Sequence, residues 1–389
     1  MFPRSEAENM DSGALAWAEI DLGAIGHNVR ELRRISRPPA RLMAVVKANA
    51  YGHGHVQVAR EALQNGAGFL GVARIAEAIA LRREGIDAPL LIFGDTPRER
   101  MKEIPEWDLR QTLWSAEKAR QLSESLCSMG KTARIHIKCD SGMGRLGLPA
   151  FPEENLKQTV REISQIMRMP GLECEGIFTH FAASDSRDLS YARLQTERFL
   201  HLLECLRARG MEFPIRHAAN SAAIIALPES HLDMVRAGIS LYGLPPSDEM
   251  NLQNIRLRPA MRLKSRIIHL KKVDKDFCVS YGMTYKTPEP TRIATVALGY
   301  ADGYSRLLSN RGRMLVHGKA APVIGRVCMD LTMLDVGHIP DAAVGDEVLA
   351  FGDDALSAGE IASLLGTINY EVVSSLTSRV KRIYKHPSC

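Results

Sequence analysis

The stretch AVVKANAYGHG, residues 44–54, decides how the rest of the sequence is interpreted. A short apolar run, typical of a buried strand, ends at Lys47, and a turn that contains Tyr51, His53 and two glycines follows it. Lysine is rarely fully buried unless it is paired. Lys47 is therefore expected either to extend its amine into water or to be held at the strand end for chemistry.

Short apolar runs of this kind recur from roughly residue 40 to residue 245, and the segments between them have helical spacing. The runs are LMAVVKA (42–48), GFLGVA (68–73), PLLIFG (89–94), LRQTLWS (109–115), ARIHIKCD (133–140), CEGIFTHFA (174–182), IRHAANS (215–221) and MVRAGISLYG (234–243). The helical stripes include Val56, Ala59, Ala62 and Leu63, and later Phe199, Leu202, Leu203 and Leu206 before Gly210. This alternation predicts an α/β fold with an N-terminal (β/α)8 TIM barrel, and an open doubly wound sheet is the alternative.

The pattern changes after Leu244. Residues 245–254 are polar, begin with two prolines and are typical of a linker. Short alternating apolar runs separated by turn residues follow, and they predict a mostly-β domain with one helix near residues 357–365. The clearest alternation is Val327, Met329, Leu331 and Met333, and residues 344–346 have the composition of a turn. We therefore expect a barrel domain over residues 1–250, with a loose leader of about a dozen residues, and a C-terminal β-rich domain over residues 251–389.

The composition is that of an ordinary globular protein, with 45% hydrophobic residues, 24% charged residues and a net charge of +5. No basic face or aromatic stacking motif favours a nucleic-acid partner, and the basic cluster at residues 379–386 is interpreted as a solvated surface or edge strand. No apolar run approaches the ~20 residues of a membrane span, and residues 1–13 lack the apolar core of a signal peptide. The seven cysteines form no CxxC pattern and fit reduced thiols. We expect a cytoplasmic protein with no membrane partner and no metal site.

Functional residues of a (β/α)8 barrel lie where the strands end, at the C-terminal rim. The predicted strands end near polar residues from distant parts of the sequence: Lys47, Lys138, Asp140, Arg145, Thr179, His180, His217, Asn220, Ser221 and Arg236. A single member such as His180 is more often a structural residue, and a purely structural pair with Asp140 is an alternative explanation of Lys138. The coincidence of the whole set at one rim is what indicates a functional site.

The chemistry of this site depends on how SGMGRLG, residues 141–147, is interpreted. Its GxGxxG spacing would suit a dinucleotide loop, but Pro149 and Pro152 delay the next helix, and Arg145 has no special use in such a loop. A reactive lysine, an arginine and several phosphate-binding donors suit pyridoxal phosphate instead, which binds to lysine as a Schiff base. The candidate phosphate donors are Tyr51, Ser221, Gly238 and Ile239.

Nine motifs carry a family resemblance, in order and with plausible spacing. They are AVVKANAYGHG, KCDSGMGRLG, THFAASD, HAANSAA, VRAGISLYGL, VSYGMTYK, ALGYADGYSR, GRVCMD and INYEV. Together they closely resemble the bacterial alanine racemase family, from Ala16 to Tyr384. The resemblance implies a fold type III pyridoxal-phosphate enzyme, with a (β/α)8 barrel and a C-terminal β domain. Such an enzyme interconverts L-alanine and D-alanine and supplies D-alanine for peptidoglycan.

The resemblance also assigns roles to individual positions. Lys47 matches the lysine that holds the cofactor and acts as the base for the D enantiomer, and Tyr281 matches the base for the L enantiomer. In the family this tyrosine comes from the partner subunit, which implies a head-to-tail homodimer with two shared active sites. The other expected cofactor-binding residues are Tyr51, Arg145, His180, Asn220, Ser221, Arg236, Gly238, Ile239 and Tyr370, and the expected substrate-binding residues are Arg145, Tyr300 and Met329. Further matches are Asp185, Arg306 and Arg326 at the substrate entrance, and Lys138, which is carbamylated in some members.

The reaction itself explains two of these roles. Racemisation removes a proton from one face of the substrate Cα and returns one to the other face, so it needs a base on each face. Arg236 matches the arginine that contacts the pyridine nitrogen, with His217 behind it. Because arginine stays protonated, that nitrogen is expected to stay unprotonated, which weakens the electron sink and reduces side reactions such as transamination.

Three alternatives remain open. A racemase for serine or for basic amino acids would share the fold, but it is expected to have a more open entrance and often an exported chain. A decarboxylase of the same fold type would need neither the tyrosine of VSYG nor an arginine at the ring nitrogen. A pyridoxal-phosphate carrier without turnover usually lacks the second domain. Tyr300, Arg306 and Tyr370 favour a small substrate, alanine.

Overall fold

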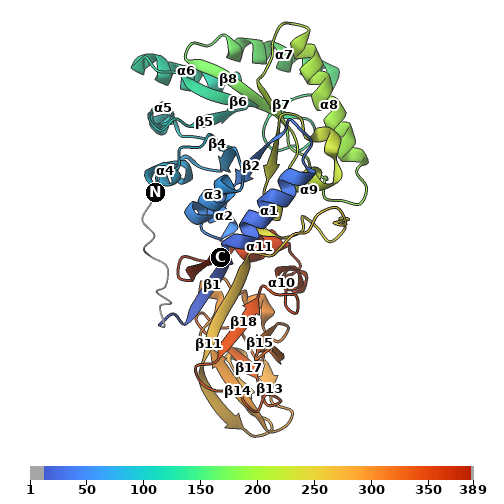
Figure 1. Cartoon of the computed structure of the whole chain (residues 1–389). Helices are drawn as coiled ribbons and strands as arrows, with labels where there is room; N and C mark the ends of the chain where they lie inside the picture. Colours follow the sequence, from blue (N-terminus) through green and yellow to red (C-terminus); the bar gives the residue numbers. More distant parts are fainter. Residues whose placement is uncertain (1–12, 387–389) are drawn as a thin grey trace. The chain divides into compact units, whose positions relative to one another are not determined.

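The computed structural model describes residues 13–386, so the predicted leader, residues 1–12, and Cys389 lie outside the described residues. The chain divides into two compact units (Figure 1). One unit is Ala24–Arg258, and the other combines the described residues from Pro259 onward with the N-terminal segment 13–23. The division after Arg258 falls later than residue 250, where the linker had placed it.

Parallel strands form the centre of the first unit. Their order is β10-β2-β3-β4-β5-β6-β8-β9, and each neighbouring pair is parallel. Backbone hydrogen bonds from Asp233 to Arg216 and from Arg236 to Ala219, both 3.0 Å, join the last strand to the first. The strands thus form a nearly closed eight-stranded barrel, which confirms the predicted fold class and excludes the open sheet.

Each predicted apolar run overlaps one strand of this barrel. The strands are β2 (Arg41–Val45), β3 (Phe69–Val72), β4 (Leu90–Ile92), β5 (Arg110–Leu113), β6 (Ala133–Asp140), β8 (Leu172–Phe178), β9 (Ile215–His217) and β10 (Met234–Ala237), with the short β7 (Leu148–Pro149) beside β6. The last three barrel strands end several residues before the predicted runs do. His180, Asn220 and Gly238 therefore lie just beyond the C-terminal ends of their strands, where functional residues of a barrel are expected.

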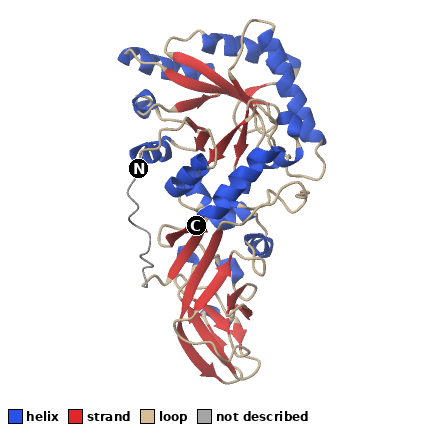
Figure 2. Ribbon diagram, viewed as in Figure 1, coloured by secondary structure: helices blue, strands red, loops and turns tan. Residues whose placement is uncertain are grey.

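Helices lie between successive strands and surround the barrel (Figure 2). They are α1 (Leu22–Ile35), α2 (Lys47–Tyr51), α3 (His55–Gln64), α4 (Ile75–Arg83), α5 (Glu103–Glu106), α6 (Ala116–Met129), α7 (Glu153–Met167), α8 (Ser190–Arg207) and α9 (Ser221–Ala226). Helix α6 has clear signals at both ends, because the Ser115 side chain accepts from the Lys118 N–H and Gly130 adopts a left-handed conformation. The barrel interior is filled by Met43, Val45, Phe69, Leu91, Ile215 and Met234.

The second unit is built mainly from antiparallel strands. Its main sheet has the order β16-β15-β18-β11-β1-β19, and β14 pairs with both β11 and β17. The strands are β1 (Ala16–Asp21), β11 (Met261–Val273), β12 (Cys278–Val279), β13 (Tyr285–Lys286), β14 (Thr291–Val296), β15 (Arg313–Val316), β16 (Lys319–Pro322), β17 (Thr332–Asp335), β18 (Glu347–Phe351) and β19 (Lys381–Lys385). Strand β19 ends the order, so the basic cluster forms an edge strand, as interpreted.

The N-terminal strand β1 differs most from the prediction, which had placed it in the barrel domain. It pairs in antiparallel fashion with β11 and in parallel with β19. Its Trp17, Ala18 and Ile20 side chains are buried in this sheet. The physical reason is that a nearly closed barrel offers no free edge to a further strand, whereas β11 and β19 leave a place for one between them.

Two details of the second unit also differ from the prediction. The expected helix appears as α10 (Ala358–Leu365), capped by Ser357, and a second short helix, α11 (Asn369–Ser374), follows it. Of the alternating residues 327–333, only those from Thr332 onward, where β17 begins, form a strand. The Cys328 N–H donates to the Leu331 carbonyl at 2.8 Å and closes a turn there.

Candidate active site

The turn after β2 carries Lys47 in an unusual backbone conformation. Ala48, Asn49 and Ala50 all have φ 53°, with ψ between 45° and 53°, and Tyr51 has φ 50°. These values describe a left-handed helical turn without glycine, which costs about 1–2 kcal/mol per residue. The Glu77 carboxylate supports the turn by accepting from the Ala48 N–H at 2.6 Å. Strain of this kind persists where the surrounding structure holds it, and it is common at functional sites.

Lys47 itself is half-buried at the C-terminal rim of the barrel. Its amine lies 6.0 Å from the centre of the Tyr51 ring. Burial lowers the pKa of Lys47, the charge of Arg145 lowers it further, and the charge of Glu77 opposes both. A larger fraction of this amine is therefore neutral at a given pH than for an ordinary lysine, which suits a nucleophile or a base.

Arg236 lies at the centre of a buried hydrogen-bond cluster. Its guanidinium donates to the carbonyls of Thr179 at 2.9 Å and Ala218 at 2.8 Å. It also contacts His217 Nδ1 at 3.0 Å and His180 Nδ1 at 3.1 Å. Burial, followed by the charge of Arg145, lowers the pKa of Arg236 to about 9, so the group stays charged at neutral pH.

Both histidines of this cluster are held neutral. Burial, and then the charge of Arg236, places the pKa of His217 well below its ordinary value. The same two causes, in the same order, act on the pKa of His180. The two rings can therefore accept hydrogen bonds from the guanidinium at neutral pH.

A second cluster joins the ends of β9 and β10. The Ser221 hydroxyl oxygen accepts from the Gly238 N–H at 2.8 Å and from the Ser240 N–H at 3.3 Å. A Cβ atom placed on Gly238 would lie 2.9 Å from the Tyr51 hydroxyl, so both residues face the same space. Ile239 begins the short helix η3 (Ile239–Tyr242) beside them. The hydroxyls of Tyr51 and Ser221 and the Ile239 N–H, with a glycine that keeps the space open, suit a phosphate.

Asn220 and Ser184 organise the edge of this second cluster. The Asn220 side-chain oxygen accepts from the Ala223 N–H at 3.0 Å and caps α9. It also accepts from the Ser184 hydroxyl at 2.9 Å. The observed position of Asn220 is thus a cap that orients the first turn of α9, where Ser221 lies.

Positive charge accumulates near Lys138, at the end of β6. Burial lowers the pKa of Lys138 to about 8, and the charges of Arg145 and Arg236 contribute after burial. The Lys138 amine lies 5.6 Å from the centre of the Phe178 ring. Four cationic side chains (Lys47, Lys138, Arg145 and Arg236) influence one another here, an arrangement that favours anionic ligands.

The glycine-rich loop after β6 does not form a dinucleotide site. The Asp140 carboxylate accepts from the N–H groups of Gly142, Met143 and Gly144 at 2.7–2.9 Å. These are the donors that a phosphate would need, and a residue of the chain itself already occupies them. The next helix, α7, begins only at Glu153, as the prolines predicted. Asp140 therefore shapes the loop that carries Arg145 and does not form the ion pair with Lys138 that was considered.

Three of the other predicted site residues, Tyr281, Tyr300 and Met329, lie on connected loops that form one rim of the second unit. Tyr281 and Met329 are exposed, at 70% and 53%, and Tyr300 is 40% exposed. The loops that carry them are connected, because the Ser280 hydroxyl donates to the Arg326 carbonyl at 2.7 Å and the Tyr300 N–H donates to the Cys328 carbonyl at 3.1 Å. Leu307 and Met283 add two more exposed apolar side chains, both at 65%. Tyr370 lies in α11 of the same unit and is half-buried.

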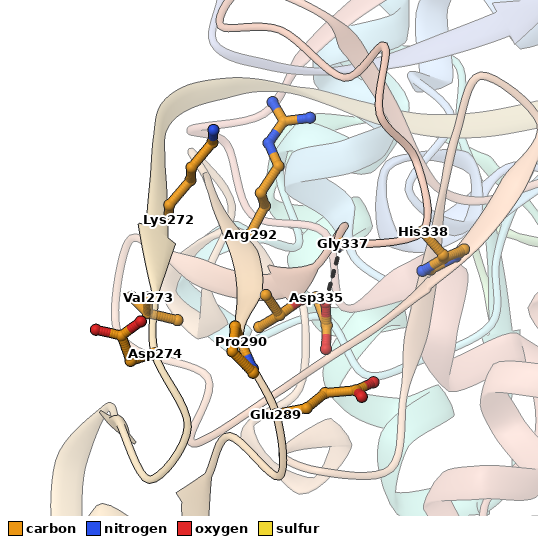
Figure 3. Close-up of a pocket in the computed structure, with 10 residues that line it drawn as sticks. Lys272, Val273, Asp274, Glu289, Pro290, Arg292, Asp335, Gly337 and His338 are labelled. Carbon is orange, nitrogen blue, oxygen red and sulfur yellow. Dashed lines mark hydrogen bonds between the residues drawn. The ribbon is translucent and has the colours of Figure 1, made fainter.

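A separate hollow of about 860 Å³ lies in the second unit (Figure 3). It is lined by Lys272, Val273, Asp274, Glu289, Pro290, Thr291, Arg292, Asp335, Gly337 and His338. Asp335 accepts from the Gly337 N–H at 3.0 Å and from the Thr291 hydroxyl at 2.6 Å, so its carboxylate closes a turn. None of the predicted site residues lines this hollow.

Over residues 13–386, no group of three or more His, Cys, Asp or Glu side chains is arranged to hold a metal ion. The six cysteines in this range are free thiols. No helix in the same range is both long and apolar enough to cross a membrane.

Comparison with known proteins gives the same family as the nine motifs. Residues 20–246 match the model of the alanine racemase N-terminal domain, and residues 260–384 match that of the C-terminal domain. The chain belongs to the alanine racemase family. An alanine racemase of Desulfosudis oleivorans is 52% identical over 375 residues, which cover 95% of this chain and 96% of the relative. One of Methanococcus maripaludis is 47% identical over 373 residues, with coverage of 95% and 98%.

Solved structures of the family superpose on nearly the whole chain. An alanine racemase of Clostridium difficile has a TM-score of 0.92 at 38% identity, covering 96% of this chain and 97% of its own. That of Bacillus anthracis, solved with bound L-Ala-P, has a TM-score of 0.88 at 38% identity, covering 96% of this chain and 95% of its own. The fold and the family expected from the sequence are confirmed.

Three residues of the first unit were missed by the sequence analysis. Glu77 supports the turn that carries Lys47, and His136 and Glu175 continue the hydrogen bonds of His217 away from Arg236. Glu77 follows Arg74 by three residues at the start of α4, which is a helix-start spacing that local inspection can find. His136 and Glu175 carry no local signal, because they meet only in the folded barrel.

Proposed function

We propose that this chain interconverts L-alanine and D-alanine with pyridoxal phosphate bound at Lys47. The single observation that carries the proposal is a lysine of lowered pKa that follows a barrel strand. Family membership supports the reaction and the cofactor. The cationic surroundings support a site that takes both the phosphate of a cofactor and the carboxylate of an amino acid.

The residues around Lys47 suit the separate parts of this cofactor. Lys47 would hold it through its amine, and Tyr51, Ser221, Gly238 and Ile239 would bind its phosphate. The remaining cofactor-binding residues that we propose are Arg145, His180, Asn220, Arg236 and Tyr370. Bound there, the cofactor would withdraw electrons from the Cα of the attached amino acid and make its proton more acidic.

Two side chains would then move the Cα proton. The Lys47 amine, half-buried and with a lowered pKa, would take or return the proton on the D face. The Tyr281 hydroxyl would do the same on the L face. Arg145, Tyr300 and Met329 would bind the substrate carboxylate and shape the entrance, and their size favours alanine over larger amino acids.

We propose that Tyr281 reaches the site of a second copy of the chain, in a head-to-tail homodimer. Tyr281 and its neighbours Met283, Leu307 and Met329 are each more than half exposed within one chain. A rim of this kind is typical of a surface that a partner covers. Two identical chains would each supply Lys47 to one site and Tyr281 to the other.

Mixing two inactive variants tests this arrangement. Lys47→Ala and Tyr281→Phe chains, unfolded together and refolded, would form mixed dimers in which one site has both defects and the other has none. Activity should return to about a quarter of the wild-type value, because half of the random dimers are mixed and each has one intact site. If each site were built from a single chain, no activity would return.

The Arg236 guanidinium would face the ring nitrogen of the cofactor and leave it without a proton, since arginine has no proton acceptor to offer. This restricts how far charge spreads from Cα into the ring and thereby limits transamination. Arg236→Glu should increase the yield of pyruvate per racemisation event. An unchanged yield would contradict this role.

The main experiment is a chiral assay in deuterated water. The purified protein with pyridoxal phosphate would be given a panel of L-amino acids, and D-product and Cα deuterium would be scored. D-alanine with deuterium at Cα, and little product from serine, lysine or arginine, is the expected result. Turnover of serine or basic residues would favour a broader racemase, and the absence of exchange would overturn the proposal.

The cellular role that we propose is supply of D-alanine for peptidoglycan from the cytoplasm. Its test is growth of a bacterial strain that depends on external D-alanine. Expression of the wild-type chain should remove this dependence, whereas expression of the Lys47→Ala variant should not. Failure of the wild-type chain, despite activity in the extract, would contradict the biosynthetic role.

A further inference from the structure

A continuous line of hydrogen bonds crosses the interior of the barrel from Arg236 to Glu175. Arg236 contacts His217 Nδ1 at 3.0 Å, and His217 Nε2 contacts His136 Nδ1 at 2.9 Å. His136 Nε2 contacts the Glu175 carboxylate at 3.1 Å. Both imidazoles are fully buried, and Arg236 is 4% exposed. The residues come from β10, β9, β6 and β8, so no part of the line is local in sequence.

The two ends of this line determine the direction of every bond in it. A guanidinium only donates and a carboxylate only accepts. His217 Nδ1 must therefore accept from Arg236, which leaves its proton on Nε2, and this proton is donated to His136 Nδ1. His136 in turn keeps its proton on Nε2 and donates it to Glu175. Each histidine thus has one permitted tautomer, and an extra proton on either ring would place two donors face to face.

The packing around the two rings keeps them in this position. The His217 ring stacks on Phe178 with centroids 4.6 Å apart and planes 10° apart. A Cβ atom on Gly176 would lie 2.5 Å from His136 Nδ1, so only glycine leaves room for this imidazole. Burial also lowers the pKa of His136, although the hydrogen bond to Glu175 opposes that effect.

Glu175 remains a carboxylate at the far end of the line. Burial acts to raise its pKa, but the hydrogen bond from His136 and the charge of Arg110 outweigh burial, and the pKa is lowered. Arg110 Nε lies 3.3 Å from the carboxylate, and Arg134 Nε lies 4.0 Å from it. The terminal acceptor is therefore charged and held in place by two neighbouring cations.

We infer that Glu175 is a positioning residue for Arg236: through His136 and His217, it fixes the direction in which the buried guanidinium is hydrogen-bonded and so keeps that group facing the cofactor. This inference rests on the proposed function, in which Arg236 limits transamination. Without an acceptor at position 175, the His136 Nε2 proton has no partner. If the proton moves to Nδ1, His217 must move its own proton to Nδ1, opposite Arg236, and the guanidinium loses that bond.

The test compares Glu175→Leu and Glu175→Gln with a matched control. Leucine removes the acceptor, whereas glutamine keeps an acceptor oxygen without the charge. Glu173→Gln is the control, because Glu173 lies on the same strand and also contacts Arg134, at 3.7 Å, but does not contact His136. The measured quantity is the number of racemisation events per molecule of pyruvate formed. In the pyruvate reaction, alanine, one water and the cofactor bound to Lys47 would give pyruvate, pyridoxamine phosphate and the free Lys47 amine.

This ratio should fall at least about fivefold in Glu175→Leu, the lower end of the effect of an unsatisfied buried donor. Glu175→Gln should restore most of the ratio, and Glu173→Gln should leave it unchanged. A ratio that stays at the wild-type value in Glu175→Leu, while the wild-type chain racemises alanine, would overturn the inference.

Neutron crystallography of the wild-type protein gives a second readout that needs no activity. Deuterium should occupy Nε2 alone on both His136 and His217. Deuterium on Nδ1 of either ring would overturn the inference, even if the protein proved to be an active racemase. If the expected tautomers are found in a protein that has no racemase activity, the tautomers support the hydrogen-bonded line. The missing activity then overturns only the proposed function.

Discussion

Glu77→Gln should loosen the left-handed turn that carries Lys47. One carboxylate oxygen of Glu77 accepts from the Ala48 N–H at 2.6 Å, and the other accepts from the Ala73 and Arg74 N–H groups at 2.8 and 3.0 Å. Glutamine has a single acceptor oxygen. In the more favourable orientation of the glutamine amide, its oxygen keeps the two bonds to Ala73 and Arg74. Its NH2 group then faces the Ala48 N–H, which loses its acceptor.

The size of the effect follows from the strain in the turn. Four successive left-handed residues store about 4–8 kcal/mol, and a hydrogen bond to a charged group contributes about 1.5–3 kcal/mol. Since Glu77 is half-buried, the lower value applies, and it corresponds to about tenfold more frequent opening of the turn. The pKa of Lys47 should also fall further, because the charge of Glu77 is what raises it.

Hydrogen exchange measured by mass spectrometry checks the first effect on peptides that cover residues 47–54. Exchange there should become about tenfold faster, since it reports local opening. The pH dependence of the rate at which the cofactor-free protein binds added pyridoxal phosphate checks the second effect, because the neutral amine reacts, and its midpoint should move to lower pH. Glu84→Gln is the control, because Glu84 forms a surface pair with Arg60 at 3.3 Å and exposed pairs contribute little. Unchanged exchange in residues 47–54 would refute the reasoning.

Three further predictions concern the rest of the site. Gly238→Ala should weaken cofactor binding at least about tenfold in a fluorescence titration, because its Cβ would lie 2.9 Å from the Tyr51 hydroxyl. The control Gly68→Ala has open space around its Cβ and should bind the cofactor as the wild type does. Equal cofactor affinities of the two variants would contradict the phosphate site. Lys138, with a pKa of about 8, should take up carbon dioxide as a carbamate with release of a proton. Uptake should increase as the pH passes upward through that value, because the neutral amine reacts, and Lys138→Met should abolish the mass increase in bicarbonate. Asp140→Asn should raise the KM for alanine more than it lowers kcat, since it removes an acceptor from the loop that carries Arg145; an unchanged KM would contradict this.

The barrel could be predicted from sequence because its signals are local and repeated. Each apolar run is bounded by turn residues, and each intervening helix shows its own apolar stripe. Lys47 is recognisable for the same reason, since a charged residue directly follows such a run. The loop at residues 141–147 was also judged correctly, because Pro149 and Pro152 exclude an immediate helix. The structure adds the cause, which is the Asp140 carboxylate.

Long-range arrangements could not be predicted in this way. Nothing in ANAY indicates a left-handed turn, since Ala48 and Ala50 individually favour right-handed helix, and Glu77, whose acceptor helps to stabilise the alternative, lies 29 residues after Ala48. The line from Arg236 to Glu175 depends on residues that face one another inside a closed sheet. The register that brings them together is a property of the complete barrel.

The assignment of β1 shows a third limit. The strand was recognisable, but not the sheet that it joins, because both units contain sheets and the chain passes through β1 first. A similar limit applies to residues 327–333, where the alternation is real but a turn at Cys328 interrupts it. Pattern alone does not reveal how backbone hydrogen bonds are distributed between a ladder and a turn.

The pairing of β1 has a consequence for how the chain is made on the ribosome. Its partners β11 and β19 begin at Met261 and Lys381, so at about 5–20 residues per second the first partner is synthesised roughly ten to fifty seconds after β1. All eight barrel strands are synthesised during that interval, while an apolar strand with Trp17 and Ile20 stays unpaired. The nascent chain therefore exposes a segment that is open to chaperones, and to other nascent chains, until the last strand is released.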